Sequence, residues 1–399
     1  MGAFHGHPAP PAPGETPATQ KTRLQVYTPT IGVSKTTTSH IPLALRPEVV
    51  DMDVRRMLQF SFLGFLFCLT QSAVGDGLNF VLVSKNIDDA NFVAAARGCA
   101  EAARAEGDAC MHLGPSGAAH FRAQDKVVRQ VLEQEVDGIA ISVTNGEFLA
   151  KHSLRKLEGR NIPFITFDSD MPAPYQDLRK AYVGPDNEEI GYSLGEIVNQ
   201  FKRSGSLCLM SASPFDTNLN QRLIGVREAL ADQLIDTASQ PLQGESGWFE
   251  TGRCPWFNAD DSRRAVTQIF AAFTYEDSDA VVSVGGWPLV DTDRLRSVLT
   301  EYAEHLGSDK RVFVSATGEL RPEDYALLHD GLVQGFVSID FEAMGREVYR
   351  VLKSLSDGRV VDSIRRTPVR QVVRTDLTEE TASNERPMGA GQTTSADRR

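Results

Sequence analysis

The chain has 399 residues, of which 41% are hydrophobic and 24% charged, a composition typical of a soluble globular protein long enough for two domains. Its formal net charge of -12 argues against a nucleic-acid partner, because phosphate binding requires a basic surface. The five cysteines include no Cys-x-x-Cys pair, so neither a zinc ribbon nor a thioredoxin-type site is supported.

The first 75 residues differ in composition from the rest of the chain. Residues 1–51 are rich in Pro, Thr, Ser, Gly and Ala and are expected to be disordered, or to be an extension from a start codon assigned too far upstream. Within 52–75, Arg55-Arg56 precede the apolar run Met57–Leu69 and a stretch of small residues, which predicts a secretory signal cleaved after Gly75. The apolar run Met57–Leu69 is too short to span a bilayer comfortably, because spanning needs about 20 apolar residues. A buried helix or an uncleaved anchor remains the alternative.

Between residues 78 and 183, apolar strand-like runs alternate with helical patterns. We predict strands at Leu78–Ser84, Asp108–Leu113, Val136–Val143, Asn161–Phe167 and Ala181–Val183, with helices at Asn91–Glu106, Phe121–Gln134 and Glu147–Gly159.

The same alternation continues to residue 355, and the polar tail 376–399 is expected to be disordered. Strands are predicted at Gly205–Ser211, Ile235–Leu242, Ala280–Val284, Arg311–Ala316 and Val333–Ile339, and helices at Glu188–Arg203, Asn218–Gln233, Ser262–Thr274, Asp291–Leu306, Pro322–Asp330 and Glu342–Leu355. Strands that are apolar throughout and separated by helices predict parallel sheets covered on both faces, hence two doubly wound α/β lobes. Ligands of such sheets bind beyond the carboxyl ends of the strands.

Six segments carry a resemblance to a known family: LVSKNIDDANF, DGIAISV, IPFITFDSD, YVGPDNEEIGYSLG, NQRLIGVREAL and GFVSIDFEAMGREVYRVL. In this order and spacing, over residues 78–370, the chain resembles the ribose-type, class I periplasmic sugar-binding proteins of ABC importers. The resemblance implies two lobes joined by a three-strand hinge, with 76–183 plus 340–358 forming lobe 1 and 184–339 plus 359–375 forming lobe 2. It implies a sugar-like ligand, a membrane permease as partner, a periplasmic monomer, and no cofactor, metal or catalysis.

In lobe 1, the resemblance places ligand contacts after three strands. The positions are Ser84, Asp88 or Asp89, Phe92, Ser142 and Asp168. A carboxylate accepts two hydroxyl hydrogen bonds at once, which suits adjacent sugar hydroxyls. Alternatively, Asp89 caps a helix, Phe92 is a core residue and Asp168 begins a turn.

In lobe 2, Arg222 matches an Arg-x-x-Gly-aromatic pattern except at Val226, and its guanidinium offers several donors to sugar oxygens. Trp256 or Phe257 would stack on a sugar ring, with Trp287 as a second aromatic wall. A surface arginine and core aromatics are the alternatives.

Three positions depart from the family pattern. Gly285 stands where the family has Asn, Thr317 where it has Asp, and Ile339 begins a crossover that is usually polar. We keep these three as ligand-facing positions. The departures argue against ribose itself and leave a modified sugar, a polyol or a less polar signalling molecule open.

Gly184-Pro185 and the residues after it are predicted to form hinge structure rather than ligand contacts. The catalytic motifs of nucleotide-binding, hydrolase and metalloprotease sites were not found in the sequence. The histidines show no metal-ligand spacing: His112, His120, His152, His305 and His329. Cys99, Cys110, Cys208 and Cys254 could include one disulfide, but the sequence does not indicate which two of them pair. A receptor subunit for a histidine kinase or chemoreceptor is the alternative function.

Overall fold

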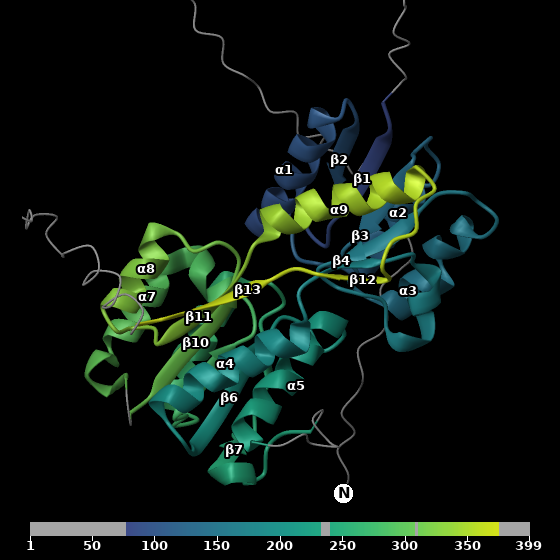
Figure 1. Cartoon of the computed structure of the whole chain (residues 1–399). Coiled ribbons are helices and arrows are strands. Elements are labelled where there is room, and N and C mark those ends of the chain that lie inside the picture. Colours follow the sequence, from purple (N-terminus) through teal and green to yellow (C-terminus); the bar gives the residue numbers. More distant parts are fainter. Residues whose placement is uncertain (1–76, 233–239, 308–309, 375–399) are drawn as a thin grey trace, which may run out of the picture. The chain divides into compact units, whose positions relative to one another are not determined.

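The structure is a computed structural model that describes residues 77–232, 240–307 and 310–374 (Figure 1). The predicted N-terminal extension (1–51), the predicted signal peptide (52–75) and the predicted tail (376–399) lie outside these ranges. Within them, none of the helices has the length and apolar character needed to cross a membrane.

Lobe 1 is built on a six-stranded parallel sheet in the order β12-β5-β4-β3-β1-β2 (Figure 1). Its strands are β1 (Asn79–Val83), β2 (Ala109–Leu113), β3 (Gly138–Ile141), β4 (Phe164–Phe167), β5 (Tyr182–Gly184) and β12 (Ile364–Arg366). Alternate residues of β1 enter different cores. Phe80 and Leu82 belong to the core that also contains residues of α1 (Ala90–Ala105) and α9 (Phe341–Ser356). Val81 and Val83 pack with residues of α2 (Phe121–Val131) and α3 (Gly146–Lys151).

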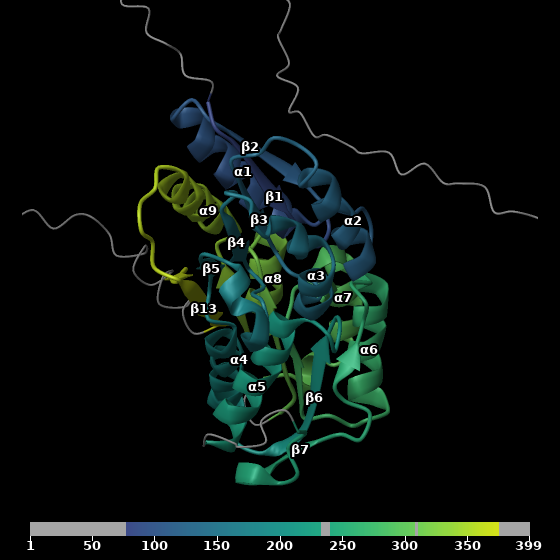
Figure 2. The same cartoon turned by 90° about the vertical axis from the view of Figure 1, so that its right-hand side faces the viewer.

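Lobe 2 is built on a second sheet in the order β13-β11-β10-β9-β6-β7, with β8 also pairing with β6. Its strands are β6 (Gly205–Ser211), β7 (Trp248–Glu250), β8 (Trp256–Phe257), β9 (Ala280–Ser283), β10 (Val312–Thr317), β11 (Gly335–Ile339) and β13 (Val369–Val373). All pairs are parallel except that between β11 and β13. One face is covered by α4 (Asn187–Phe201) and α5 (Thr217–Ala231), and the other by α6 (Ser262–Thr274), α7 (Thr292–Thr300) and α8 (Pro322–His329) (Figure 2).

The chain passes between the two sheets three times, after β5, after β11 and after β12. The two-lobed α/β fold predicted from the sequence is therefore confirmed. The last boundary was predicted too early: residues 364–366 pair with β5 in lobe 1, so the third crossing lies at Thr367 and Pro368 rather than at residue 359. The reason is that β12 continues the parallel hydrogen bonding of lobe 1, with Ile364 opposite Tyr182.

Three predicted elements differ from the observed ones. For Ile235–Leu242, residues 235–239 lie outside the described ranges, while 240–242 form no strand and the strand of this region is β7. The predicted helix Glu147–Gly159 breaks at His152 into α3 and the 3-10 helix Ser153–Leu157, because the Ser153 amide donates to Asp125 Oδ1 at 3.0 Å. The predicted helix Asp291–Leu306 ends at Thr300 and is followed by the short 3-10 helix Ala303–His305.

Among the described residues two disulfides are formed, one more than was expected from the sequence. Cys99–Cys110 joins α1 to β2 in lobe 1. Cys208–Cys254 joins β6 to the loop that leads into β8 in lobe 2. Each bridge therefore links two elements of the same lobe.

Candidate ligand-binding site

A cavity of about 430 Å³ is lined by residues from the carboxyl ends of strands in both sheets. This is the position expected for a ligand of a parallel α/β fold, and the volume suits one small molecule. Lobe 1 contributes Lys85, Asn86, Asp88, Asp89, Ala90, Asn91, Phe92 and Asp168 to the wall. Lobe 2 contributes Asp216, Asn218, Leu219, Arg222, Asp260, Gly285, Gly286, Trp287, Leu289, Val290, Thr317, Glu319 and Arg321, and Ile339 and Phe341 flank the second crossing.

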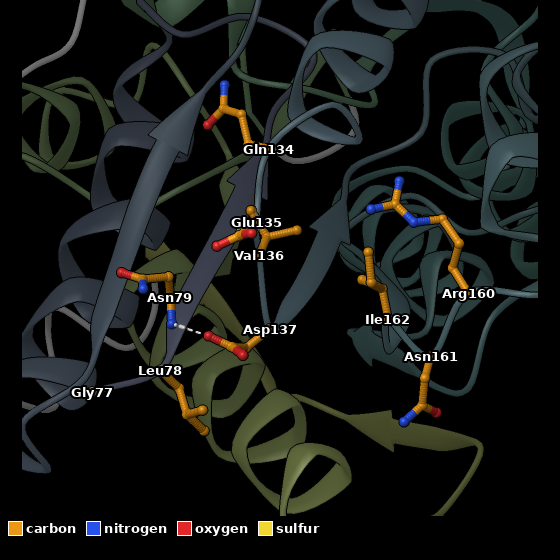
Figure 3. A pocket seen from close by; sticks show the side chains of 10 residues that line it. All are labelled: Gly77, Leu78, Asn79, Gln134, Glu135, Val136, Asp137, Arg160, Asn161 and Ile162. Atoms are coloured by element: carbon orange, nitrogen blue, oxygen red, sulfur yellow. Dashed lines mark hydrogen bonds between the residues drawn. The ribbon is translucent and has the colours of Figure 1, made fainter. Parts of the chain in front are cut away.

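A second hollow, of about 540 Å³, lies at the opposite end of the lobe 1 sheet (Figure 3). Its walls are the first residue of β1, Asn79, and residues just before β1, β3 and β4, including Asp137 and Arg160. Asp137 Oδ2 accepts from the Asn79 amide at 2.7 Å, and Arg160 donates to the Leu132 carbonyl. Because this hollow is at the amino ends of the strands, the interlobe cavity is the better candidate for the ligand site.

Asp168 is held in the wall by hydrogen bonds to its side chain and to its backbone. It follows β4 with a left-handed backbone (φ 57°), which is unusual for a residue other than glycine. Its side chain is 5% exposed, and Oδ2 accepts from the Ser142 hydroxyl at 2.8 Å. Its backbone carbonyl accepts from Tyr182 Oη at 3.1 Å and from Asn187 Nδ2 at 3.2 Å. One oxygen, Oδ1, remains directed toward Arg222 Nη2 at 3.8 Å, beyond hydrogen-bond length.

Arg222 approaches Asp168 from lobe 2. Its Nε donates to Asn187 Oδ1 at 2.9 Å and its Nη1 donates to the Val284 carbonyl at 3.0 Å. Burial lowers the pKa of this guanidinium, although an arginine stays protonated in proteins and the Asp168 charge opposes the shift. Asn187, the first residue of α4 after the first crossing, therefore holds both the Asp168 backbone and the Arg222 side chain.

Close packing of α4 on α5 explains why Arg222 reaches this position. A Cβ on Gly191 would overlap the Arg222 carbonyl, and a Cβ on Gly225 would overlap the Glu188 carbonyl. The absence of side chains at both positions lets the helix backbones approach.

After β1, Asp89 both caps a helix and lines the cavity. Its Oδ1 accepts from the Asn91 amide at 2.8 Å and so caps α1, while the residue also lines the cavity. Burial raises the pKa of the Asp89 carboxyl, and the neighbouring charges of Asp168 and Asp260 raise it further. Phe92 lines the cavity as well but is 7% exposed, packed edge-on against Phe167 and Phe341.

Trp287 and Gly285 form a linked pair in lobe 2. A Cβ on Gly285 would lie 2.5 Å from Cη2 of Trp287, so the indole ring occupies the space that a side chain at 285 would need. The Trp287 Nε1 donates to Asp260 Oδ1 at 2.9 Å, which fixes the ring at the cavity wall. A side chain at 285 and the Trp287 ring in this position therefore exclude each other.

Nine of the predicted residues line the cavity: Asp88, Asp89, Phe92, Asp168, Arg222, Gly285, Trp287, Thr317 and Ile339. Four do not. Ser142 lies behind Asp168, and Ser84 is fully buried with its hydroxyl 2.8 Å from His112 Nε2. Trp256 and Phe257 form β8 beside β6, which places them at the sheet rather than in the cavity wall.

The sequence analysis missed a charged contact between the lobes. Lys85 Nζ, just beyond β1, lies 3.0 Å from Asp216 Oδ2 and 3.0 Å from Asn218 Oδ1, both near the start of α5. Burial raises the pKa of the Asp216 carboxyl, and the Lys85 charge opposes that rise. Lys85 follows a predicted strand directly and Asp216 precedes a predicted helix, but nothing in the sequence indicates that they pair.

Among the described residues, no group of three or more His, Cys, Asp or Glu side chains is arranged to hold a metal ion. What the cavity does offer is hydrogen bonding from two sides. Lobe 1 presents the acceptors Asp89 and Asp168, and lobe 2 presents the donor Arg222 beside the aromatic face of Trp287. Such a wall can bind and orient a small polar molecule.

Solved structures with the same fold are binding proteins for sugars. A glucose-galactose binding protein from Geobacillus stearothermophilus is 19% identical, with a TM-score of 0.62 over 75% of this chain and 99% of that one. An ABC transporter solute-binding protein from Burkholderia graminis in complex with D-arabinose is 20% identical, with a TM-score of 0.62 over 75% and 96%. One from Agrobacterium vitis with bound D-fucose is 14% identical, with a TM-score of 0.63 over 77% and 99%. No curated protein matches the chain.

The family comparison covers both lobes. The model described as "Periplasmic binding protein domain" matches residues 80–359, which is more than half of the chain and includes most of the cavity wall. This is a family of binding proteins and not of enzymes, in agreement with a cavity that presents hydrogen-bonding groups and an aromatic face. The chain therefore belongs to the periplasmic binding protein family, and its fold is that of the class I, ribose-type members.

Proposed function

We propose that this chain is the solute-binding component of an ABC importer, which captures a sugar or a related polyhydroxylated ligand between its lobes. The observation that carries the proposal is the pair Asp168 and Arg222. They come from opposite lobes, each side chain is 5% exposed, and both line one cavity. A carboxylate accepts from hydroxyl groups and a guanidinium donates to hydroxyl or ring oxygens. A polyhydroxylated molecule satisfies both at once.

Contact with both lobes gives the ligand its effect on conformation. A ligand shifts an open–closed equilibrium only as far as it binds one state more tightly, and bonds to Asp168 and Arg222 together require the closed state. The face of Trp287 adds apolar contact to the C–H groups of a sugar ring. We propose that the closed form is what a membrane permease receives.

The similar structures favour import over sensing, because they include solute-binding proteins of ABC transporters with D-arabinose or D-fucose bound. With this function we propose a periplasmic location reached through the signal at 52–75, and a monomer. The departures at Gly285, Thr317 and Ile339 support a ligand other than ribose, since they replace polar side chains of the family pattern.

A thermal-shift screen of the purified protein against pentoses, hexoses, deoxysugars and polyols tests the proposal. A ligand present at 100 times its dissociation constant should stabilise the fold by about 2.7 kcal/mol. The variant Asp168→Asn keeps the shape of the side chain but removes its charge, and should weaken binding about 10- to 100-fold by calorimetry, because hydrogen bonds to a charged group are worth about 1.5–3 kcal/mol.

The matched control is Asp137→Asn in the second hollow, which makes the same chemical change at the amino ends of the strands. Its ligand affinity should equal that of the unmodified protein. If no member of the panel shifts the melting temperature, or if both variants bind equally well, the proposed site is wrong.

A further inference from the structure

In the part of the chain that the structure describes, two ion pairs connect the lobes across the cavity, and they differ in geometry. Between Asp168 Oδ1 and Arg222 Nη2 the distance is 3.8 Å, so this pair leaves room for a ligand atom to bond to both groups. Between Lys85 Nζ and Asp216 Oδ2 it is 3.0 Å, a direct charge-assisted hydrogen bond. The Lys85–Asp216 pair therefore joins the two lobes directly, without a ligand between them.

The Lys85 ammonium is buried, and two of its three N–H groups donate hydrogen bonds. The Lys85 and Asp216 side chains are 8% and 11% exposed, and a second N–H of Lys85 donates to Asn218 Oδ1 at 3.0 Å. An ammonium has three donors, so one remains. Because Lys85, Asp216 and Asn218 all line the cavity, the lysine side chain takes up space and acceptors that a ligand would otherwise use.

We propose that Lys85 is a specificity-determining residue that takes the place of a cationic group of a ligand: its ammonium satisfies Asp216 and Asn218 and bridges the lobes before any ligand arrives. Asp216 and Asn218 are then not available to bind a ligand. The choice of ligand therefore depends on the other end of the cavity, around Asp168 and Arg222. The inference rests on the proposed function only in taking this cavity as the ligand site.

Energetics support the assignment. Removing one partner of a buried ion pair leaves the other charge uncompensated, which is more costly than the pair is favourable. Without the Lys85 ammonium, the Asp216 carboxylate and the Asn218 amide oxygen would need water or an added cation. The simplest way to admit water is to separate the lobes at this end of the cavity.

Chemical rescue tests the proposal without any sugar. In Lys85→Ala, the atoms removed beyond Cβ correspond to n-propylamine. Small-angle scattering of the unliganded variant should give a larger radius of gyration than that of the unmodified protein. Adding n-propylamine should restore the smaller value and raise the melting temperature, whereas the neutral isostere 1-propanol should do neither. Neither additive should change the unmodified protein, whose site is filled.

The variant Asp216→Asn tests the same Lys85–Asp216 ion pair with almost no change in side-chain volume. It replaces Lys85→Ala in the test if that variant does not fold. It should also expand the unliganded protein, and it should not respond to n-propylamine because the lysine is still present. An unchanged radius of gyration in these variants, or equal effects of n-propylamine and 1-propanol on Lys85→Ala, would overturn the proposal. Since no sugar is used, that result leaves the proposed function standing, while a failed sugar screen leaves this bridge untouched.

Discussion

The two walls of the cavity hold their key charged side chains by different means. Asp168 in lobe 1 is fixed at a strand end by Ser142 of the neighbouring strand end and by backbone bonds. Arg222 in lobe 2 depends on Asn187 at the first crossing and on the Val284 carbonyl. Of the other wall residues of lobe 2, Asp260 lies in the loop after β8, and Trp287 begins the short 3-10 helix Trp287–Asp291. Lobe 1 therefore presents Asp168 directly at the end of a strand, whereas lobe 2 presents its donor from α5 and its aromatic from a short 3-10 helix.

Removal of the disulfides should give the largest loss of stability, and the loss should differ between the two lobes. Cys208–Cys254 spans 46 residues and anchors the loop before Asp260, while Cys99–Cys110 spans 11 residues on the outer part of lobe 1. Loop-closure entropy predicts that removing Cys208–Cys254 by double alanine substitution costs about 4 kcal/mol, and removing Cys99–Cys110 about 3 kcal/mol. Urea unfolding measures both values. Ligand affinity should fall only for the lobe 2 pair, and equal affinities would show that the loop wall needs no such anchor.

Arg222→Ala, which removes the donor of the lobe 2 wall, should give the next largest loss of stability. It removes the opposite charge beside Asp168 and the donor to the acceptors on Asn187 and Val284, so the free energy of unfolding should fall by about 3 kcal/mol. The loss is smaller than the stability of an ordinary domain, so the variant should fold. Denaturant titration measures it. Arg350→Ala, where the side chain is 63% exposed, should change stability by less than about 0.5 kcal/mol. Similar losses in both variants would contradict the assigned role.

A smaller, pH-dependent effect belongs to lobe 1. Burial lowers the pKa of His112 from 6.5 to about 4, and its ring bonds to the Ser84 hydroxyl behind the wall. Between these two pH values the unfolded chain binds more protons than the folded one, so the His112 contribution to stability is lost as the pH falls through that window. The loss is on the order of 2 kcal/mol.

The measurement is urea unfolding at pH 7 and pH 4.5. His112→Gln should lose less stability than the unmodified protein over this interval, which isolates the histidine from carboxyls that titrate in the same range. His329→Gln, at a side chain that is 81% exposed, should behave like the unmodified protein. Parallel pH curves for all three proteins would place the proton uptake elsewhere.

Much of the fold and part of the site follow from local sequence patterns. Asp168 and Arg222 could be located because each sits in a segment whose strand or helix is read from periodicity and resemblance. Trp256 and Phe257 were misplaced because sequence position does not show which face of the short strand β8 meets the cavity.

What the sequence did not reveal comes from contacts between distant segments. Lys85 and Asp216 are separated by 131 positions and meet only because the lobes come together. Of the strand predicted at Ile235–Leu242, the described residues 240–242 form no strand because an apolar pattern does not fix pairing, and β7 forms the edge of the sheet. The position of β12 is likewise set by its pairing with β5 and not by composition.

The three crossings also set the order in which the lobes can be completed. Lobe 2 is nearly continuous from α4 to β11 and lacks only its edge strand β13. Lobe 1 begins first along the chain but needs α9 and β12, and a Cβ on Gly98 of α1 would overlap the Glu342 carbonyl of α9. Because contacts between distant segments form late, we expect the lobe that is synthesised second to become native first, while the amino-terminal lobe waits with one apolar face uncovered for the end of the chain.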